Sequence, residues 1–306
     1  MPRERHRGAL GGLTIESEIG IPGLSSAASD DAPADVRIVI GRVATSGPGQ
    51  TIGPDGSLTL DVADVGRFRV DGGRSITVEP LVEPGRESHL RTFLLGTAIG
   101  TIFHQRGILP LHASTLQIGD GAVAIAGSSG AGKSTLAHTL VQAGYPLIAD
   151  DVTPITFADG MPLAWPLLPQ VKLWRDALDR AAIATSGLET IADRFDKYRL
   201  PTPGSFATTP VPLRAVVVLS DADGDEEVLD PLSGLHCLTT LRAQIYRSRI
   251  GEEIRGRDAL FFDAGRLASR IVVARLGRRR DTGRLLRLAA VVVKTAACGM
   301  PAVSAA

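Results

Sequence analysis

Lysine is scarce in this chain of 306 residues: it occupies only positions 133, 172, 197 and 294, and arginine supplies the other basic side chains. Cysteine and aromatic residues are scarce too, with two cysteines and 4% Phe, Trp and Tyr. Cys237 and Cys298 match no metal-ligand or redox spacing, and this usage is typical of a reducing, cytoplasmic compartment. No apolar run approaches the roughly 20 residues that a membrane span needs.

The charges of the chain balance, with 33 basic and 33 acidic residues and a formal net charge of zero. No broad electrostatic attraction to nucleic acid or to an anionic membrane is expected, so neither is an expected partner. The length and an apolar content of 44% are enough for one large core or two smaller ones. The oligomeric state stays open, with a homo-oligomer among the alternatives.

The first 34 residues mix Gly, Ala, Ser and Asp without periodicity, and they predict a disordered arm whose removal is tolerated. Residues 35–105 predict a small antiparallel β region. Its strands are short apolar runs separated by Gly, Asp and Pro turns, at 36–44, 58–62, 68–70 and 75–79. Residues 87–105 place apolar side chains along one helical face, so we expect a helix that joins this region to the next domain.

Residues 106–306 alternate short apolar runs with amphipathic segments, which is typical of an α/β domain. Strands 114–118 and 122–126 are expected to form a hairpin through Gly119–Gly121, followed by a helix over 134–143. Further strands are expected at 146–149, 214–220 and 271–274, and further helices at 231–246, 257–270 and 282–297.

The sequence GSSGAGKS, from Gly127 to Ser134, fits the P-loop pattern of glycine, four residues, glycine, lysine, and serine or threonine. Glycines let backbone N–H groups turn toward an anion, and the start of the following helix adds its positive dipole end. The loop predicts binding of ATP with Mg²⁺: Lys133 would reach the β- and γ-phosphates, and the Ser134 hydroxyl would bind the metal ion. The expected nucleotide-binding residues are Gly127, Ser128, Ser129, Gly130, Ala131, Gly132, Lys133, Ser134 and Thr135.

Two adjacent carboxylates, Asp150 and Asp151, follow the expected strand 146–149, and acids at the C-terminal end of such a strand face the ligand crevice. Phosphoryl transfer uses one carboxylate to hold Mg²⁺, and a second can accept the proton of a hydroxyl acceptor. Neighbouring residues on a strand point in different directions, so the pair can divide these roles. In isolation the pair is more typical of a turn or a helix cap, and the neighbouring P-loop is what favours a catalytic role.

His112 lies just before the expected strand 114–118, and by spacing alone a histidine among apolar residues is more often a structural group than a catalyst. The order of LHAS, GSSGAGKST and LIADD, however, resembles the HPr kinase/phosphorylase superfamily, in which a histidine, a P-loop and an aspartate pair follow one another along the chain. The resemblance implies a P-loop kinase core of the HPr-kinase/PEP-carboxykinase-like type, and an ATP-dependent serine kinase.

Carried over to this chain, the resemblance implies that Asp150 is the base toward a serine hydroxyl, assisted by His112. It also implies that Asp151 is the metal-side acid, with Ser134, and that Lys133 is the catalytic lysine. The segment FLLGTAIGTIFHQRGILPLHAS, from Phe93 to Ser114, is similar to the HPr-kinase-like proteins of ribosomal peptide pathways. That similarity implies a lasso-peptide precursor with a C-terminal serine as the acceptor.

Three other functions stay open: an HPr-type regulatory protein kinase, a P-loop small-molecule kinase, and a nucleotide-binding module without transfer. HPr kinases carry a glycine-rich signature after the aspartates, and this chain has GMPLAWPLLPQVKLW there, from Gly160 to Trp174. In small-molecule kinases the P-loop strand usually opens the domain, whereas over 100 residues precede it here. The roles of four basic residues also stay open, namely Lys172, Lys197, Arg247 and Arg249.

Overall fold

The computed structural model describes residues 4–24, 33–45, 47–83, 86–192, 195–221, 228–278 and 285–297. The chain divides into two compact units. Unit 1 comprises Met1–Pro110, Lys172–Leu200 and Arg247–Ala259, and unit 2 comprises Leu111–Val171, Pro201–Tyr246 and Leu260–Ala306. The second domain predicted from the sequence, 106–306, is therefore interrupted twice by chain that belongs to unit 1.

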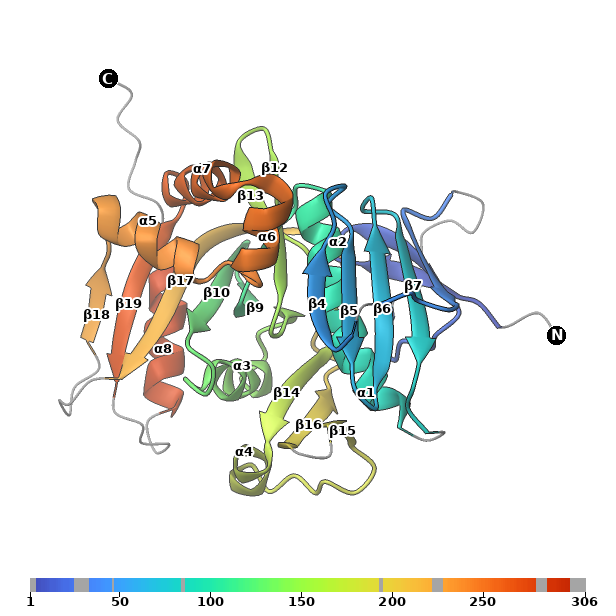
Figure 1. Ribbon diagram of the computed structural model, residues 1–306. Coiled ribbons are helices and arrows are strands. Elements are labelled where there is room, and N and C mark those ends of the chain that lie inside the picture. Colours follow the sequence, from blue (N-terminus) through green and yellow to red (C-terminus); the bar gives the residue numbers. More distant parts are fainter. Residues whose placement is uncertain are drawn as a thin grey trace. The chain divides into compact units, whose positions relative to one another are not determined.

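Unit 1 contains a seven-stranded sheet with the order β1-β2-β3-β7-β6-β5-β4 (Figure 1). Its strands are β1 (His6–Leu10), β2 (Leu13–Ser17), β3 (Val36–Ile40), β4 (Gly49–Ile52), β5 (Leu58–Val62), β6 (Gly66–Asp71) and β7 (Ser75–Pro80). The pairs β2–β3 and β3–β7 are parallel, so the sheet is mixed where the sequence predicts an antiparallel one. Parallel neighbours need a long connection, and the segments between these strands are long enough to provide it.

The prediction of a disordered arm is wrong over residues 4–24. Strands β1 and β2 form a hairpin through Gly11 and Gly12, both at positive φ, and alternate residues of β2 are buried. Leu13 and Ile15 are 6% and 0% exposed, so this hairpin belongs to the core of the sheet. Two strands of five residues, joined by a glycine pair, are too short to stand out from a polar, glycine-rich background. Residues 25–32 of the predicted arm lie outside the described residues, as does Cys298.

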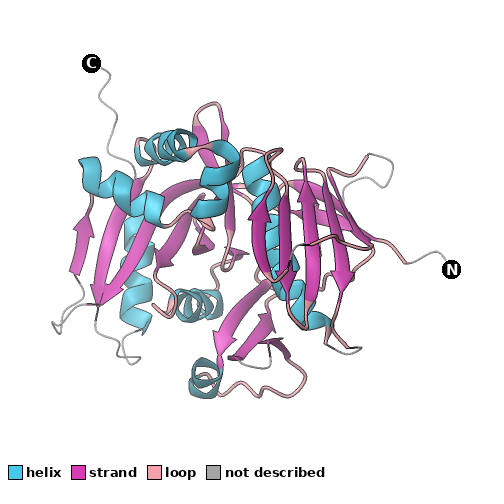
Figure 2. Ribbon diagram, viewed as in Figure 1, coloured by secondary structure: helices cyan, strands magenta, loops and turns pink. Residues whose placement is uncertain are grey.

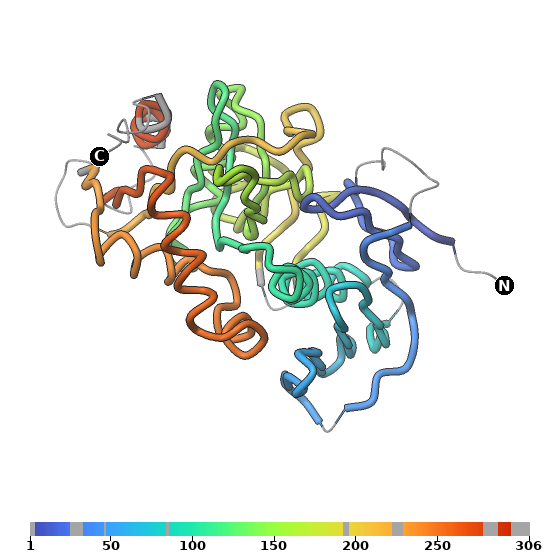
Figure 3. The backbone as a smooth tube through the Cα atoms, turned by 90° about the horizontal axis from the view of Figure 1, so that it is seen from above, coloured from blue at the N-terminus to red at the C-terminus, as the bar shows by residue number. Residues whose placement is uncertain are grey.

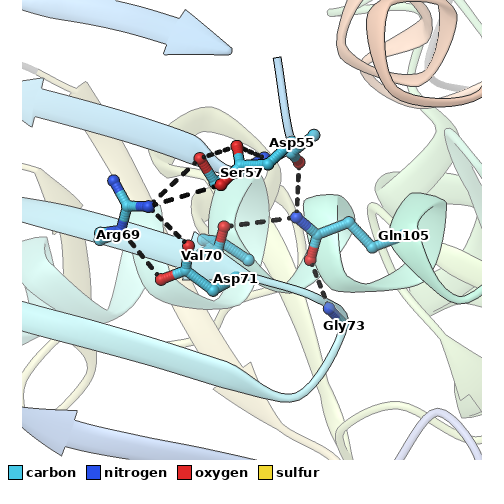
Figure 4. A network of polar contacts seen from close by, with 8 residues as sticks. Asp55, Ser57, Arg69, Val70, Asp71, Gly73 and Gln105 are labelled. Carbon is cyan, nitrogen blue, oxygen red and sulfur yellow. Dashed lines mark hydrogen bonds and ion pairs between the residues drawn. The ribbon is translucent and has the colours of Figure 1, made fainter. Parts of the chain in front are cut away.

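The helix predicted over 87–105 is confirmed, and a π-helical turn interrupts it. The segment consists of α1 (Glu87–Phe93), the π-helix η1 (Leu94–Ala98) and α2 (Ile99–Gln105), and η1 is buried throughout. Gln105 attaches the end of the helix to the sheet (Figure 4): its amide nitrogen donates to the carbonyls of Gly56 and Val70, and its oxygen accepts from the Gly73 N–H at 2.7 Å. One side chain thus satisfies the backbone of two β-turns.

A small three-stranded sheet in unit 1 has the order β14-β16-β15, and the sequence patterns do not predict it. Its strands are β14 (Gln170–Trp174), β15 (Glu189–Ala192) and β16 (Phe195–Pro201), and the remaining helices of this part are α4 (Arg175–Arg180) and α6 (Ser248–Arg255). Arg199 is buried and donates to the Thr92 hydroxyl at 2.6 Å and to the Ser88 carbonyl. This arginine ties β16 to α1.

Unit 2 is a mixed α/β structure (Figure 2). Its strands are β8 (Leu109–Leu111), β9 (Ala113–Ile118), β10 (Gly121–Gly127), β11 (Leu147–Ala149), β12 (Thr153–Ala158), β13 (Met161–Ala164), β17 (Val211–Asp221), β18 (Val228–Pro231) and β19 (Val272–Arg278). The main path of the sheet has the order β11-β9-β10-β17-β13-β12-β8, and β19 pairs with both β17 and β18. The central strands β10, β17 and β19 are parallel, and β10 is apolar and buried along its whole length because both of its faces are covered.

The helices of unit 2 are α3 (Lys133–Gln142), α5 (Gly234–Ala243), α7 (Arg257–Ala268), whose first residues belong to unit 1, and α8 (Leu285–Ala297). Helices α3 and α8 contact each other and both pack on β9 and β10; Figure 3 looks along the axis of α8, in red. The sequence predicts the hairpin β9–β10, the strands β17 and β19, and these four helices to within a few residues, although residues 282–284 of the last helix lie outside the described residues. No helix among the described residues is long and apolar enough to cross a membrane.

The buried β1–β2 hairpin leads to a stability prediction. Ile15→Ala should lower the free energy of unfolding by about 2–5 kcal/mol, because it removes fully buried methyl groups and leaves a cavity. Gln50→Ala, on the exposed edge strand β4, is the control and should change it by less than about 0.5 kcal/mol. Urea unfolding followed by circular dichroism measures both. An effect of Ile15→Ala as small as that of the control would mean that the hairpin does not pack on the sheet.

Candidate functional site

The GSSGAGKS loop connects the end of β10 to the start of α3, as the sequence predicts. Gly127 has a φ of 138°, and a Cβ atom there would lie 2.8 Å from the Leu219 carbonyl oxygen. Gly132 caps α3 with a φ of 86°. Only glycine tolerates these positions without strain, and the resulting loop delivers the chain to the N-terminus of α3, where the helix dipole favours an anion.

Lys133 is buried, and its ammonium group forms hydrogen bonds with the loop and with His112. It donates to the carbonyls of Gly127 at 2.9 Å and Ser128 at 3.1 Å. It also lies 3.1 Å from Nε2 of His112, which stands between β8 and β9. Two of these acceptors are in the loop itself and the third is on a different strand connection, so the lysine joins the loop to His112.

The two contacts of the His112 ring fix its tautomer. Nδ1 lies 2.9 Å from the carbonyl oxygen of Asp151, which can only accept a hydrogen bond, so Nδ1 carries the hydrogen. Nε2 faces the Lys133 ammonium, which can only donate, so Nε2 presents its lone pair. The ring is therefore a neutral imidazole that connects the loop lysine to the second of the two acids.

The surroundings of His112 favour this neutral form. Burial lowers the pKa of His112 below its ordinary value, and the positive charge of Lys133 lowers it further. The charge of Asp151, its backbone carbonyl and the charge of Asp150 act in the opposite direction, and they are weaker. Burial likewise lowers the pKa of His138 on α3, and Asp150 offsets part of this.

The carboxylate of Asp150 faces the loop serine. Its Oδ1 accepts hydrogen bonds from the Ser134 hydroxyl at 2.9 Å and from the Ser114 hydroxyl at 2.6 Å. Asp150 is 7% exposed and Ser114 is fully buried. Two donors on one oxygen fix the orientation of the carboxylate and keep it beside the first residues of α3.

Asp151 has a different environment from its neighbour. Its φ of 74° is in the left-handed region, which is uncommon for residues other than glycine, although aspartate adopts it more readily than most. This turn points the Asp151 carbonyl at His112, and Oδ1 of its side chain lies 3.6 Å from Nδ1 of the same ring. The Asp151 side chain is 26% exposed, so solvent or a second substrate can reach it.

The order of strands explains how these groups meet. Strand β9 lies between β10, which leads to the loop, and β11, which leads to the acids, and it is antiparallel to both. Strands β10 and β11 therefore end at the same edge of the sheet, and β9 begins there. His112 and Ser114 stand at the beginning of β9, between the loop and the two acids.

The oxygen atoms of Ser134 and Asp150 fit a magnesium ion. Mg²⁺ prefers hard oxygen ligands and is usually held by one or two carboxylates, with phosphate oxygens and water completing its shell. A serine hydroxyl and a carboxylate that are already 2.9 Å apart at the start of α3 provide that donor set. Among the described residues, no group of three or more His, Cys, Asp or Glu is suited to a metal ion, and a phosphate-bound Mg²⁺ does not need one.

Several contacts of the site were not predicted from the sequence. Ser114 follows His112 by two residues, and the two-residue period of a strand could have placed both on one face. Gln244 and Tyr246 come from a distant segment and carry no local signal: the Gln244 carbonyl accepts from the His112 N–H at 2.7 Å, and the Tyr246 ring lies 5.8 Å from the His112 ring.

Four basic residues whose roles the sequence leaves open are all in unit 1, whereas the groups described above are all in unit 2. One of them, Lys197, lies over the ring of Trp174, 5.6 Å from its centroid, in a cation–π contact. The other three are Lys172, Arg247 and Arg249.

No family model and no curated protein sequence matches the chain. Among solved structures, it is similar to the structure of the Hpr(Ser) kinase/phosphatase from Coxiella burnetii, with 15% sequence identity and a TM-score of 0.33. The match covers 60% of this chain and 94% of that one. A likeness this distant supports no statement about activity.

The environment of His112 leads to a titration prediction. In a nuclear magnetic resonance titration, the His112 ring should become protonated at a pH below the ordinary value of about 6.5. The lowered pKa means that the neutral ring adds stability which is present above pH 6.5 and is lost as the pH falls through the folded-state pKa. In Lys133→Met the midpoint should rise, because a neighbouring positive charge is gone. An unchanged midpoint in this variant would show that the lysine does not contact the ring in solution.

Proposed function

We propose that this chain is an ATP-dependent kinase that transfers a phosphoryl group to a serine hydroxyl of a peptide or small protein. The observation that carries the proposal is that one neutral histidine contacts the loop lysine and the main-chain carbonyl of Asp151, with the partly exposed Asp151 carboxylate 3.6 Å from the same ring. A second, buried carboxylate beside it holds the loop serine. These are the groups that phosphoryl transfer to a hydroxyl requires: a cation and backbone donors for phosphate, oxygen ligands for a metal ion, and a proton acceptor.

The loop and Lys133 account for phosphate binding and for stabilisation of charge in the transition state. The backbone N–H groups at the start of α3 and the lysine ammonium provide positive charge around the phosphates. The hydrogen bonds to Gly127 and Ser128 already hold the Lys133 side chain at the loop, so it does not have to move in from solvent when phosphate binds. This preorganisation supports a role in transfer as well as in nucleotide binding.

The contacts of the two acids favour the reverse of the roles that the family resemblance implies. Asp150 is buried and bonded to Ser134, which suits the metal side. When Mg²⁺ is bound, it neutralises charge that develops on the phosphate oxygens. Asp151 is partly exposed and lies beside the neutral His112, which suits a base that accepts the proton of the serine hydroxyl. We therefore propose Asp151 as the base and Asp150 as the metal ligand.

The acceptor is proposed from the sequence resemblance: a precursor peptide of the lasso type that ends in serine. The exposed side chain of Asp151 is consistent with an acceptor that arrives from solvent, such as a flexible chain end. An HPr-type protein and a small hydroxyl-bearing metabolite are the alternative acceptors, and the first experiment below distinguishes them.

The transfer reaction can be tested directly. Purified protein with ATP and Mg²⁺ should phosphorylate a peptide that ends in serine and leave the same peptide ending in alanine unchanged, as measured by mass spectrometry. Lys133→Ala should reduce transfer below detection, because the phosphates lose their cationic group. Transfer to HPr or to a metabolite, with none to the peptide, would overturn the acceptor. Near-normal turnover in Lys133→Ala would overturn the role of the loop.

The roles of the two acids can be separated by a Mg²⁺ titration. Asp151→Asn should keep the same Mg²⁺ dependence but transfer phosphate about 10²- to 10⁴-fold more slowly, since an amide cannot accept the serine proton. Asp150→Asn should require more Mg²⁺, and raising the Mg²⁺ concentration should restore part of its activity. If Mg²⁺ rescues Asp151→Asn and not Asp150→Asn, then Asp150 is the base and Asp151 the metal ligand, as the family resemblance implies. Normal transfer by both variants would show that the pair is structural.

A further inference from the structure

Gln244 contacts two parts of the site that are far apart in the sequence. It follows α5 directly and lies 117 residues after Gly127. Its backbone carbonyl accepts the N–H of His112 at 2.7 Å, and its side-chain oxygen Oε1 accepts the N–H of Gly127 at 3.0 Å. One residue therefore anchors the main chain of the histidine and the main chain of the first loop glycine.

The Gln244 side chain is itself held in place. A backbone N–H can only donate, so the side-chain oxygen must face Gly127, and the amide nitrogen then faces the Thr240 carbonyl at 3.5 Å. The Gln244 N–H donates to the Leu241 carbonyl at 2.9 Å, and the next residue, Ile245, forms a β-bridge with Leu111. The main chain is fixed on both sides of Gln244, so its amide approaches the loop from a rigid support.

The hydrogen bond to Gly127 acts at the point where the loop begins. The N–H of Gly127 is bound by Gln244, and its carbonyl is bound by the Lys133 ammonium at 2.9 Å. Both main-chain polar groups of Gly127, whose φ is 138°, are thus hydrogen-bonded. Because glycine has no side chain to restrict its backbone rotation, these hydrogen bonds limit it here. Without Gln244, Gly127 would keep its pairing with Leu219 and the lysine contact but lose the hydrogen bond to its N–H.

We propose that Gln244 is a positioning residue that sets where the phosphate loop lies relative to His112. It does not touch the reacting groups; it aligns two elements that do. The same residue holds His112 through its carbonyl and Gly127 through its amide, so it adds a second connection between them to the pairing of Ala113 with Ala126. The expected change in kcat rests on the proposed kinase function, whereas the expected change in the loop position rests on the contacts of Gln244 alone.

The kinetic test uses two substitutions that separate the hydrogen bond from the shape of the side chain. Gln244→Met keeps the length but has no oxygen, so kcat should fall about 10- to 100-fold, as expected for a small misplacement of catalytic groups. Gln244→Glu keeps an oxygen acceptor for Gly127 but loses the donor to Thr240, so kcat should fall less than in Gln244→Met, while its negative charge near the phosphates raises KM for ATP. Gln117→Met, on β9, is the matched control, because the side-chain nitrogen of Gln117 donates to the carbonyl of Gly119 in the adjoining turn.

A second measurement does not depend on catalysis. In Gln244→Met, the Gly127 amide should exchange its hydrogen faster than in the normal protein, and the His112 ring signals should shift, with both unchanged in Gln117→Met. If this variant does not fold, Gln244→Asn, whose amide is one methylene shorter, takes its place. Unchanged exchange and unchanged kcat in a folded variant would overturn the inference, as would a kcat in Gln244→Glu as low as that in Gln244→Met. Faster exchange in a protein that transfers no phosphate would support the positioning role and overturn only the kinase function.

Discussion

The Lys133 ammonium group carries a full charge and is buried, so it must be surrounded by acceptors. The acceptors come from separate elements: two carbonyls of the loop and the imidazole at the start of β9. His112 is also hydrogen-bonded to the Asp151 carbonyl. The hydrogen bonds that satisfy the Lys133 charge therefore connect the loop, the central hairpin and the turn that carries the two acids. The conformation of each of these elements is constrained by the need to satisfy this group.

The same constraint determines what kind of ligand can compete for the lysine. Three acceptors of Lys133 are neutral: the carbonyl oxygens of Gly127 and Ser128 and Nε2 of His112. Hydrogen bonds between an ammonium group and a charged oxygen are roughly twice as strong as those between neutral partners. A phosphate group is therefore a better partner for Lys133 than any of these three atoms, and exchange of the His112 contact leaves Nε2 with a free lone pair beside the acids.

Local signals in the sequence predict the loop, the hairpin and the acidic pair, because each depends on residues that are close together in the chain. The β1–β2 hairpin is missed because its two strands are short and become stable only by pairing with β3 in the sheet. The three-stranded sheet around Arg199 is missed for a similar reason, since a buried arginine that bonds to α1 looks like a surface residue in the sequence. In the site, the position of Ser114 follows from the period of a strand, whereas the position of Gln244 depends on tertiary packing across 117 residues.

The hairpin β9–β10 has a consequence for how this site can change. Its turn, Gly119 and Asp120, is two residues long and fixes which residue of β9 faces which residue of β10: Ser114 lies opposite Ile125. A residue inserted here leaves the pairing unchanged if the turn takes it up as a three-residue loop. If the turn stays two residues long and the inserted residue enters a strand, the pairing shifts by one; because side chains alternate between the two faces of a strand, the faces are then exchanged. His112 and Ser114 would then point away from the loop and the acids, although no residue of the site had been altered. The arrangement of the site thus tolerates a change of length at this distant turn only where the turn, and not a strand, absorbs it.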